Sequence, residues 1–176
     1  MISLNSTSFL AVFFIVKSIN LTRTKIQILQ TVGSLANPNQ GHYSLALLEQ
    51  SNLLSCIITQ NVDGLHQLSG SGHVIELHGS LEHLECLNCK WQGEWPVHNA
   101  WQLRDITCPT CEALVKPAVV AFGEDIPINT WAQAVENIDI CSILLVIGTR
   151  LSVSSARTLV TRARAAGAQI VILNSE

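Results

Sequence analysis

The chain has little charge and no long apolar run. Asp, Glu, Lys and Arg supply 13% of its 176 residues, about half of the roughly 25% common in soluble domains, while 48% of the residues are apolar. This composition excludes a disordered chain, and the absence of a heptad charge pattern excludes a coiled coil. The longest apolar run covers residues 9–16, much shorter than the roughly 20 residues of a membrane-spanning helix. We therefore expect no membrane partner.

The apolar run at residues 9–16 has two other interpretations. It could be the apolar part of a signal peptide, but no Lys or Arg precedes it and no small-residue cleavage site is clear after it. The more ordinary interpretation is a buried strand, which we favour.

The chain also lacks an excess of positive charge and a cysteine-dense framework. Ten Lys and Arg stand against thirteen Asp and Glu, for a net charge of −3, and no basic stripe occurs, so we expect no nucleic-acid partner. Six cysteines are too few for a disulfide scaffold, and four of them form two close pairs, which favours a metal site and a reducing, cytoplasmic setting. Cys56 and Cys141 lie inside apolar segments, where we expect inert core thiols.

Helix-like and strand-like segments alternate along most of the chain. The apolar periodicity predicts helices over residues 42–50, 129–137 and 154–166, and strands over residues 53–59, 73–77, 117–123, 140–147 and 169–173. Glycines or polar residues follow these strands. This alternation predicts an α/β fold, a Rossmann-like parallel sheet.

Three parts of different character make up the predicted organisation. Residues 32–79 and 117–176 carry the α/β pattern of the Rossmann-like part. Residues 80–116 have an irregular pattern, bear the cysteine pairs and are expected to form a small inserted module. Residues 1–31 are an atypical N-terminal segment with neither glycine nor an acidic residue.

Two C-x-x-C pairs, separated by 18 residues, form the most specific motif. They are Cys86-Leu-Asn-Cys89 and Cys108-Pro-Thr-Cys111. Each pair can chelate from one tight turn, and two such turns close a tetrahedron around Zn²⁺. Two disulfides or redox-active pairs are the alternatives, but redox C-x-x-C motifs normally open a helix and neither pair does so. The spacing favours one structural zinc, held in a closed site without catalytic capacity.

Polar side chains follow two successive predicted strands. Gln60, Asn61 and Asp63 come after residues 53–59, and His78 comes after residues 73–77. In open α/β sheets, ligands bind beyond the carboxyl ends of the strands, so these groups are expected to converge on one crevice. Taken alone, a histidine before a glycine is more often a loop residue bonded to a backbone carbonyl.

The order of the motifs is much more specific than any of them alone. The segments T-Q-N-V-D-G-L-H, E-L-H-G, two C-x-x-C pairs, V-V-A-F-G-E and G-T occur in this order. Together they resemble the sirtuin family of NAD-dependent protein-lysine deacylases, over about residues 37–174. Pro38-Asn39 and Gly41-His42 match the start of a helix in that family. A general Rossmann oxidoreductase is excluded because no G-x-G-x-x-G follows a strand.

The resemblance implies a reaction and a role for particular residues. His78 matches the catalytic base, which takes a proton from a ribose hydroxyl after the acyl oxygen of an acylated lysine has displaced nicotinamide from NAD. The positions that match NAD-binding residues are Gln60, Asn61, Asp63, Gly148, Thr149 and Asn174. The segment that pairs with an acylated-lysine protein or peptide by β-augmentation contains Val120, Phe122, Gly123 and Glu124. The implied cofactors are NAD, as co-substrate, and one Zn²⁺.

The sequence departs from the family pattern near both ends. No glycine-rich G-A-G-x-S segment and no I-P-D-F-R segment is present, Arg150 replaces the serine after G-T, and the chain stops at Glu176. We therefore expect a truncated sirtuin that lacks a central strand and the phosphate-binding loop, and that binds NAD weakly.

Two activities stay open on the sequence alone. The first is an NAD-dependent deacylase; the second is an inactive remnant that acts at most as a zinc-bearing module for acylated peptides. Residues 27–30 lack the Tyr-x-x-Arg pair of the desuccinylase branch, which favours simple acyl groups. The sequence predicts no oligomeric state.

Overall fold

Five parallel strands form the larger of two sheets. The computed structural model of the protein describes residues 10–14, 37–94, 107–121 and 123–174. The strand order is β3-β2-β1-β7-β8, and all four neighbouring pairs are parallel. The strands are β1 (Leu10–Phe14), β2 (Cys56–Thr59), β3 (Val74–Glu76), β7 (Ile143–Ile147) and β8 (Gln169–Leu173). The predicted Rossmann-like parallel sheet is therefore confirmed.

The centre of this sheet is β1, which comes from the N-terminal apolar run. Val12 is in register with Ile57 of β2 on one side and with Leu145 of β7 on the other. The expectation of a strand in the run at residues 9–16 is confirmed. The expectation that the chain lacks a central strand is wrong, because residues 10–14 fill that position between two parallel neighbours.

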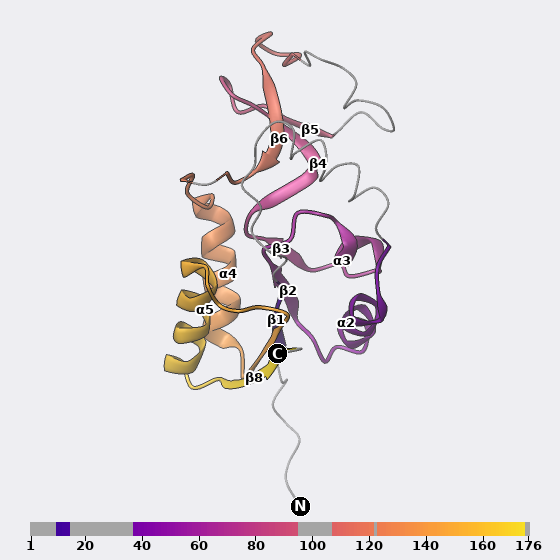
Figure 1. Ribbon diagram of the computed structural model, residues 1–176, viewed down its shortest axis with the longest axis vertical. Coiled ribbons are helices and arrows are strands. Elements are labelled where there is room, and N and C mark those ends of the chain that lie inside the picture. The colour runs from indigo at the N-terminus through magenta and orange to yellow at the C-terminus, as the bar shows by residue number, and fades with distance from the viewer. Residues whose placement is uncertain (1–9, 15–36, 95–106, 122, 175–176) are drawn as a thin grey trace, which may run out of the picture.

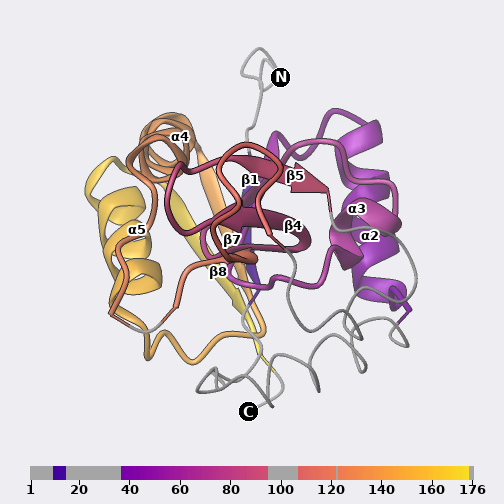
Figure 2. The same ribbon diagram turned by 90° about the horizontal axis from the view of Figure 1, so that it is seen from above.

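Helices lie on both sides of the sheet (Figure 2). Helices α4 (Ile128–Ile140) and α5 (Ser154–Ala165) cover one face, and α2 (Gln40–Gln50) with the short α3 (Leu65–Leu68) lies on the other. Helix α5 is followed by Gly167 at φ 94°, the left-handed conformation that a glycine C-cap adopts readily. The predicted helices are all present, although α4 continues through Ile140, so that β7 begins three residues later than expected.

Adjacent residues of β2 point into two separate cores. Ile58 packs with Leu144 and Leu159 in the core under α4 and α5, while Ile57 packs with Leu45 in the core under α2. Both isoleucines have no exposed surface. A parallel sheet covered on both faces needs this continuous apolar sequence, which explains why residues 53–59 show no alternation.

The second sheet is small and antiparallel, and it lies at one end of the molecule (Figure 1). Its order is β5-β4-β6, with strands β4 (Gly79–Cys86), β5 (Gln92–Glu94) and β6 (Val115–Val119). Within residues 80–94 and 107–116, which the structure describes, the chain is therefore more regular than its sequence suggests. The strand expected over residues 117–123 ends at Val119. The inserted module itself is confirmed as a separate sheet that carries the cysteine pairs.

The two remaining cysteines are buried, as expected. Cys56 and Cys141 are 4% and 5% exposed, and burial raises the pKa of the Cys56 thiol to about 11. A thiol with so high a pKa carries almost no reactive thiolate near neutral pH. Within the described part of the chain, no helix has the length and apolar character needed to cross a bilayer.

Candidate functional site

Each C-x-x-C pair lies at the tip of a β-hairpin. In the first, the amide of Cys86 donates to the carbonyl of Trp91, and in the second, the amide of Cys108 donates to the carbonyl of Ala113. The residue after each pair, Lys90 or Glu112, adopts a positive φ near 60°. The two turns therefore repeat one geometry, which directs both pairs of thiols toward the same point.

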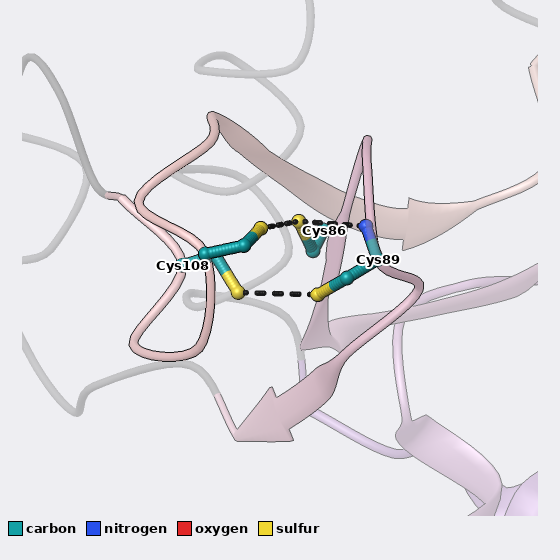
Figure 3. Close-up of side chains that lie close together, drawn as sticks. Cys86, Cys89 and Cys108 are labelled. Carbon is teal, nitrogen blue, oxygen red and sulfur yellow. Dashed lines mark hydrogen bonds between the residues drawn. The ribbon is translucent and has the colours of Figure 1, made fainter.

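The four sulfur atoms of these turns form a compact cluster. All of them lie within 4.8 Å of one another, with 3.5 Å between Cys86 and Cys111 and 3.6 Å between Cys89 and Cys108. Figure 3 shows Cys89 and Cys108 facing each other from opposite turns. Four sulfurs at about 2.3 Å from a tetrahedral zinc are about 3.8 Å apart, so the cluster fits one Zn²⁺. These separations also exclude disulfides, and all four thiols are free.

Backbone amides favour the thiolate form in the cluster. The amides of Asn88 and Cys89 donate to Sγ of Cys86, and the amide of Thr110 donates to Sγ of Cys108. The backbone N–H of Ala113 is the main cause that lowers the pKa of Cys111 to about 6. Thiolates are the form that binds zinc, and every coordination position is taken by sulfur, which makes the site structural.

His78 lies at the junction of the two sheets. It follows β3 of the parallel sheet and precedes β4 of the antiparallel sheet, and its carbonyl accepts a hydrogen bond from the amide of Val120 at 2.9 Å. Burial lowers the pKa of His78, and a hydrogen bond to the backbone of Gln60 opposes that shift. A ring that donates one N–H to a carbonyl presents its other nitrogen as an acceptor, which suits a general base.

Gly79 is required where the chain passes from one sheet to the other. Its φ is 73°, and a Cβ at this position would lie 1.9 Å from the carbonyl oxygen of Ala118 on β6. No side chain fits there without a shift of the backbone. The glycine after His78 therefore allows β4 and β6 to approach closely, which fixes the histidine beside Val120.

Gln60 and Asn61 leave the carboxyl end of β2 as buried polar residues. Each is 8% exposed, and the amide of Asn61 donates to Oγ1 of Thr59 at 3.0 Å. The Nε2 of Gln60 donates to Oγ of Ser155 at 2.9 Å, while its Oε1 is buried with no hydrogen-bond partner within the described residues. Asp63 is half-buried, and its Oδ1 accepts from the amide of Leu65 at the start of α3.

The other predicted NAD-binding residues lie at the carboxyl ends of β7 and β8. Gly148 follows β7 with a φ of 63°, and its amide donates to the carbonyl of Leu173. Thr149 is buried, and its carbonyl accepts from Nδ2 of Asn174 at 3.2 Å. Because β2, β7 and β8 are parallel, these residues share one edge of the sheet with Gln60 and His78.

The predicted peptide-binding segment divides into residues with different environments. The amide of Val120 donates a hydrogen bond to the carbonyl of His78, and Gly123 is exposed with a φ of 87°. Phe122 lies outside the described residues. Glu124 binds within the chain: Nζ of Lys116 lies 2.8 and 3.0 Å from its two carboxylate oxygens, and Oε2 accepts from the amide of Ala121 at 2.9 Å. The amide of Ala121 and then Lys116 lower the pKa of Glu124.

Two buried histidines join α2 to the loop that follows β2. His42 closes a reciprocal cap, since the amide of Asn39 donates to its Nδ1 and Oδ1 of Asn39 accepts from the amide of His42. The ring of His42 lies 4.8 Å, between centroids, from the ring of His66 on α3. Burial lowers the pKa of His66 to about 4, and His42 lowers it further. His66 thus connects α3, which follows the Gln60–Asp63 loop, to α2.

Three residues with a place in the site have no sequence signal that identifies them. Ser155 forms a hydrogen bond with Gln60, 95 positions away in sequence, and Lys116 of β6 forms an ion pair with Glu124 in the turn after the same strand. The third residue is His42, which lies in the Pro38–His42 helix start but receives no role in the site from that motif. Tertiary contacts alone show what these side chains touch.

Comparison with known proteins places the chain among relatives longer than itself. Residues 15–155 match the Sir2 family. NAD-dependent protein deacylase 2 of Archaeoglobus fulgidus is 40% identical over 144 residues, which cover 80% of this chain and 57% of that protein. NAD-dependent protein deacetylase 1 of Pyrobaculum aerophilum is 40% identical over 140 residues, 79% of this chain and 55% of its own length. The chain therefore spans little more than half of these relatives.

Two solved structures are similar to this one over nearly all of its length. The structure of Sir2Af2 bound to a myristoylated histone peptide has a TM-score of 0.77 at 33% identity and covers 96% of this chain and 79% of that one. A Sir2 structure with a p53 peptide and NAD⁺ has a TM-score of 0.82 at 26% identity, with 97% and 82% covered. The motifs, the two sheets and these similarities agree, and this chain belongs to the Sir2 family.

Proposed function

We propose that the protein is an NAD-dependent protein-lysine deacylase. In this reaction an acyl group leaves a lysine side chain for the ribose of ADP-ribose, and nicotinamide is released. The single observation that carries the proposal is the placement of His78. It lies between the two sheets, and its ring forms a hydrogen bond with the backbone of Gln60 at the carboxyl edge of the parallel sheet. The relatives named above are NAD-dependent protein deacylases and deacetylases, each 40% identical to this chain over the matched residues.

NAD fits the polar residues along the carboxyl edge of the parallel sheet. We assign the nicotinamide side to Gln60, Asn61 and Asp63, because they follow β2 beside His78. The adenosine side falls to Gly148, Thr149 and Asn174 at the ends of β7 and β8. The buried, unpartnered Oε1 of Gln60 supports a polar ligand here, since a ligand hydroxyl would satisfy it.

We assign His78 the role of the general base. Its ring is half-buried and uncharged near neutral pH, because burial lowers its pKa, and the hydrogen bond to Gln60 fixes its orientation. In the proposed reaction it takes the proton from the ribose hydroxyl that attacks the acyl carbon. Such proton transfer contributes about 10²–10⁴-fold to the rate of enzymes in general.

The acylated lysine is proposed to enter beside Val120. The bond between the Val120 amide and the His78 carbonyl brings this segment to the catalytic histidine. Gly123, Glu124 and Phe122 complete the predicted peptide segment, with an acylated-lysine protein or peptide as the partner. Val119 and the residues before it belong to β6, so the peptide segment continues a strand of the small sheet, as β-augmentation requires.

Zinc and cellular setting complete the proposal. One Zn²⁺ bound by Cys86, Cys89, Cys108 and Cys111 would hold the small sheet together without taking part in the reaction. The free thiols support a reducing, cytoplasmic setting. We also propose that residues 80–116 form a zinc-binding domain, apart from the NAD-binding domain of residues 32–79 and 117–176.

The deciding experiment measures nicotinamide release from NAD with an acetyl-lysine peptide. We expect slow turnover by the wild type, whose sequence lacks the glycine-rich phosphate-binding segment, and a further loss of at least about 10²-fold in His78→Ala. His73→Ala is the matched control, because this exposed histidine precedes the same strand, β3, and should leave the rate unchanged.

The opposite result favours the inactive alternative. If the wild type releases no nicotinamide and binds no NAD by calorimetry, the deacylase proposal is wrong. Fluorescence anisotropy with acetylated and unmodified peptides then tests the zinc-bearing peptide-binding module, which would prefer the acetylated peptide.

A further inference from the structure

A hydrogen bond between two side chains joins the two halves of the carboxyl edge. Gln60 follows β2, and Ser155 lies in the first turn of α5, after β7; the Nε2 to Oγ distance is 2.9 Å. Gln60 is 8% exposed, so its carboxamide meets little bulk water. The bond is therefore a specific contact inside the site and connects residues 95 positions apart in sequence.

In the structure Nε2 of Gln60 faces Ser155, and Oε1 is the end of the carboxamide without a partner within the described residues. The terminal torsion of glutamine is broad and roughly two-fold, so little in the side chain itself selects one orientation. With Nε2 placed on Ser155, the acceptor Oε1 is buried and has no partner within the described residues. A buried acceptor without a donor is unfavourable, and a ligand that supplies an O–H removes that penalty.

The first turn of α5 leaves Ser155 available for this role. The N-cap residue of α5 is Val153, and no side chain caps the helix. The hydroxyl of Ser155 accepts a hydrogen bond from Gln60, the residue that follows β2. The neighbouring Ser154 is exposed. The backbone of Gln60 also forms a hydrogen bond with the ring of His78. A displacement of Gln60 would therefore change the position of the catalytic histidine as well.

We propose that Ser155 is a positioning residue for NAD: it holds the Gln60 carboxamide so that Oε1 accepts a hydrogen bond from a ribose hydroxyl. This inference rests on the proposed deacylase function and adds a residue that acts through Gln60 without touching the reacting atoms. It predicts that the loss of the Ser155 hydroxyl weakens NAD binding selectively.

The test compares Ser155→Ala with Ser154→Ala, which removes a hydroxyl from the adjacent, exposed position of the same turn. Calorimetry gives the Kd for NAD, and steady-state kinetics give KM for NAD and for an acetyl-lysine peptide. We expect Ser155→Ala to raise Kd and KM for NAD roughly tenfold, as the loss of one buried hydrogen bond does, with the peptide KM unchanged. Ser154→Ala should match the wild type, and Ser155→Thr, which keeps a hydroxyl, should restore affinity.

The outcomes separate this inference from the proposed function. A wild type that binds NAD, with Ser155→Ala equal to Ser154→Ala, overturns the role of Ser155 and leaves the function intact. A wild type that binds no NAD overturns the proposed function, and this inference with it. Thermal melting monitors the folding of each variant. If Ser155→Ala is unfolded, Ser155→Cys takes its place, because cysteine is close in size to serine. Normal NAD affinity in Ser155→Cys would also count against the inference.

Discussion

Single residues in this protein often serve two purposes at once. Gln60 forms hydrogen bonds with Ser155 through its side chain and with His78 through its backbone. His42 caps α2, and its ring packs against the ring of His66. Such sharing ties the polar site to the packing of the fold. A change at one of these residues therefore affects stability and activity together unless a matched variant separates them.

The His42–His66 contact predicts acid sensitivity of the fold. The pKa of His66 is about 4 in the folded protein, lowered chiefly by burial, against 6.5 for the unperturbed side chain. Between these values the unfolded chain binds more protons than the folded one, so stability falls as pH decreases from 6.5 to 4. At about 1.4 kcal/mol per pKa unit, we expect a loss of about 2–3 kcal/mol over this window.

Urea denaturation at pH 7 and pH 5 measures this effect. His66→Asn removes the titrating group and should make the unfolding free energy less dependent on pH, although it lowers stability at pH 7. The exposed His73→Asn serves as control and should keep the wild-type dependence. Equal pH dependence in wild type and His66→Asn would show that His66 does not cause the acid sensitivity.

At the scale of elements, the small sheet depends on its two cysteine-bearing hairpins. The strands β4, β5 and β6 have eight, three and five residues, and among the described side chains of this sheet only Leu84, Cys86 and Val119 are buried apolar residues. An apolar core of this size cannot offset the entropy of ordering the sheet. The metal is therefore expected to stabilise the fold of this part.

Removal of zinc should unfold the small sheet. We expect metal analysis to find one zinc per chain. A strong chelator or Cys111→Ser should remove this zinc. Its loss should abolish the protection of backbone amides from hydrogen exchange across residues 79–94 and 107–119. Cys141→Ser is the control, because this buried cysteine lies outside the cluster and a serine can still donate to the carbonyl of Ile138. Retention of the zinc by Cys111→Ser would contradict the site.

The turn after β6 is held by an ion pair between Lys116 and Glu124. Nζ of Lys116 contacts Glu124 and the carbonyl of Val119 at 3.2 Å, and Glu124 holds the amide of Ala121. We expect Lys116→Met to increase hydrogen exchange at the Ala121 amide. It should also raise the KM for peptide about two- to fivefold, the range of exposed ion pairs.

The control for this prediction breaks an ion pair elsewhere. Arg162→Met removes the cation that binds Asp139 between α5 and α4, and it should leave peptide KM and Ala121 exchange unchanged. Lys116→Arg keeps the charge and should behave almost as the wild type. An unchanged peptide KM in Lys116→Met would mean that the turn keeps its shape without the pair.

At the scale of the whole molecule, β1 connects the two halves of the parallel sheet. It pairs with β2, which leads to Gln60, and with β7, which leads to Gly148. Without it, the nicotinamide and adenosine sides of the proposed site would have no common support. The N-terminal run is therefore an integral part of the fold.

Proline substitution tests the central position of β1. In a strand paired on both sides, each backbone N–H faces a neighbour, so Val12→Pro removes one ladder bond and leaves a carbonyl without its donor, at about 1–3 kcal/mol. Val12→Ala keeps the N–H and is the control for the shortened side chain. We expect a lower urea midpoint for Val12→Pro than for Val12→Ala; equal midpoints would place β1 outside the sheet.

The sequence by itself determined the order of the strands and long helices of the α/β part, the four clustered cysteines and the polar residues at the ends of the strands. Local patterns are sufficient for these features, because apolar periodicity, the C-x-x-C spacing and polar residues after strands all act over short stretches of chain. Only the tertiary structure decided that residues 10–14 form the central strand, that Ser155 bonds Gln60, and that Glu124 binds Lys116. Sheet order and side-chain partners depend on contacts between segments far apart in sequence, where an apolar run of any origin can fill a strand position and no local pattern marks a partner.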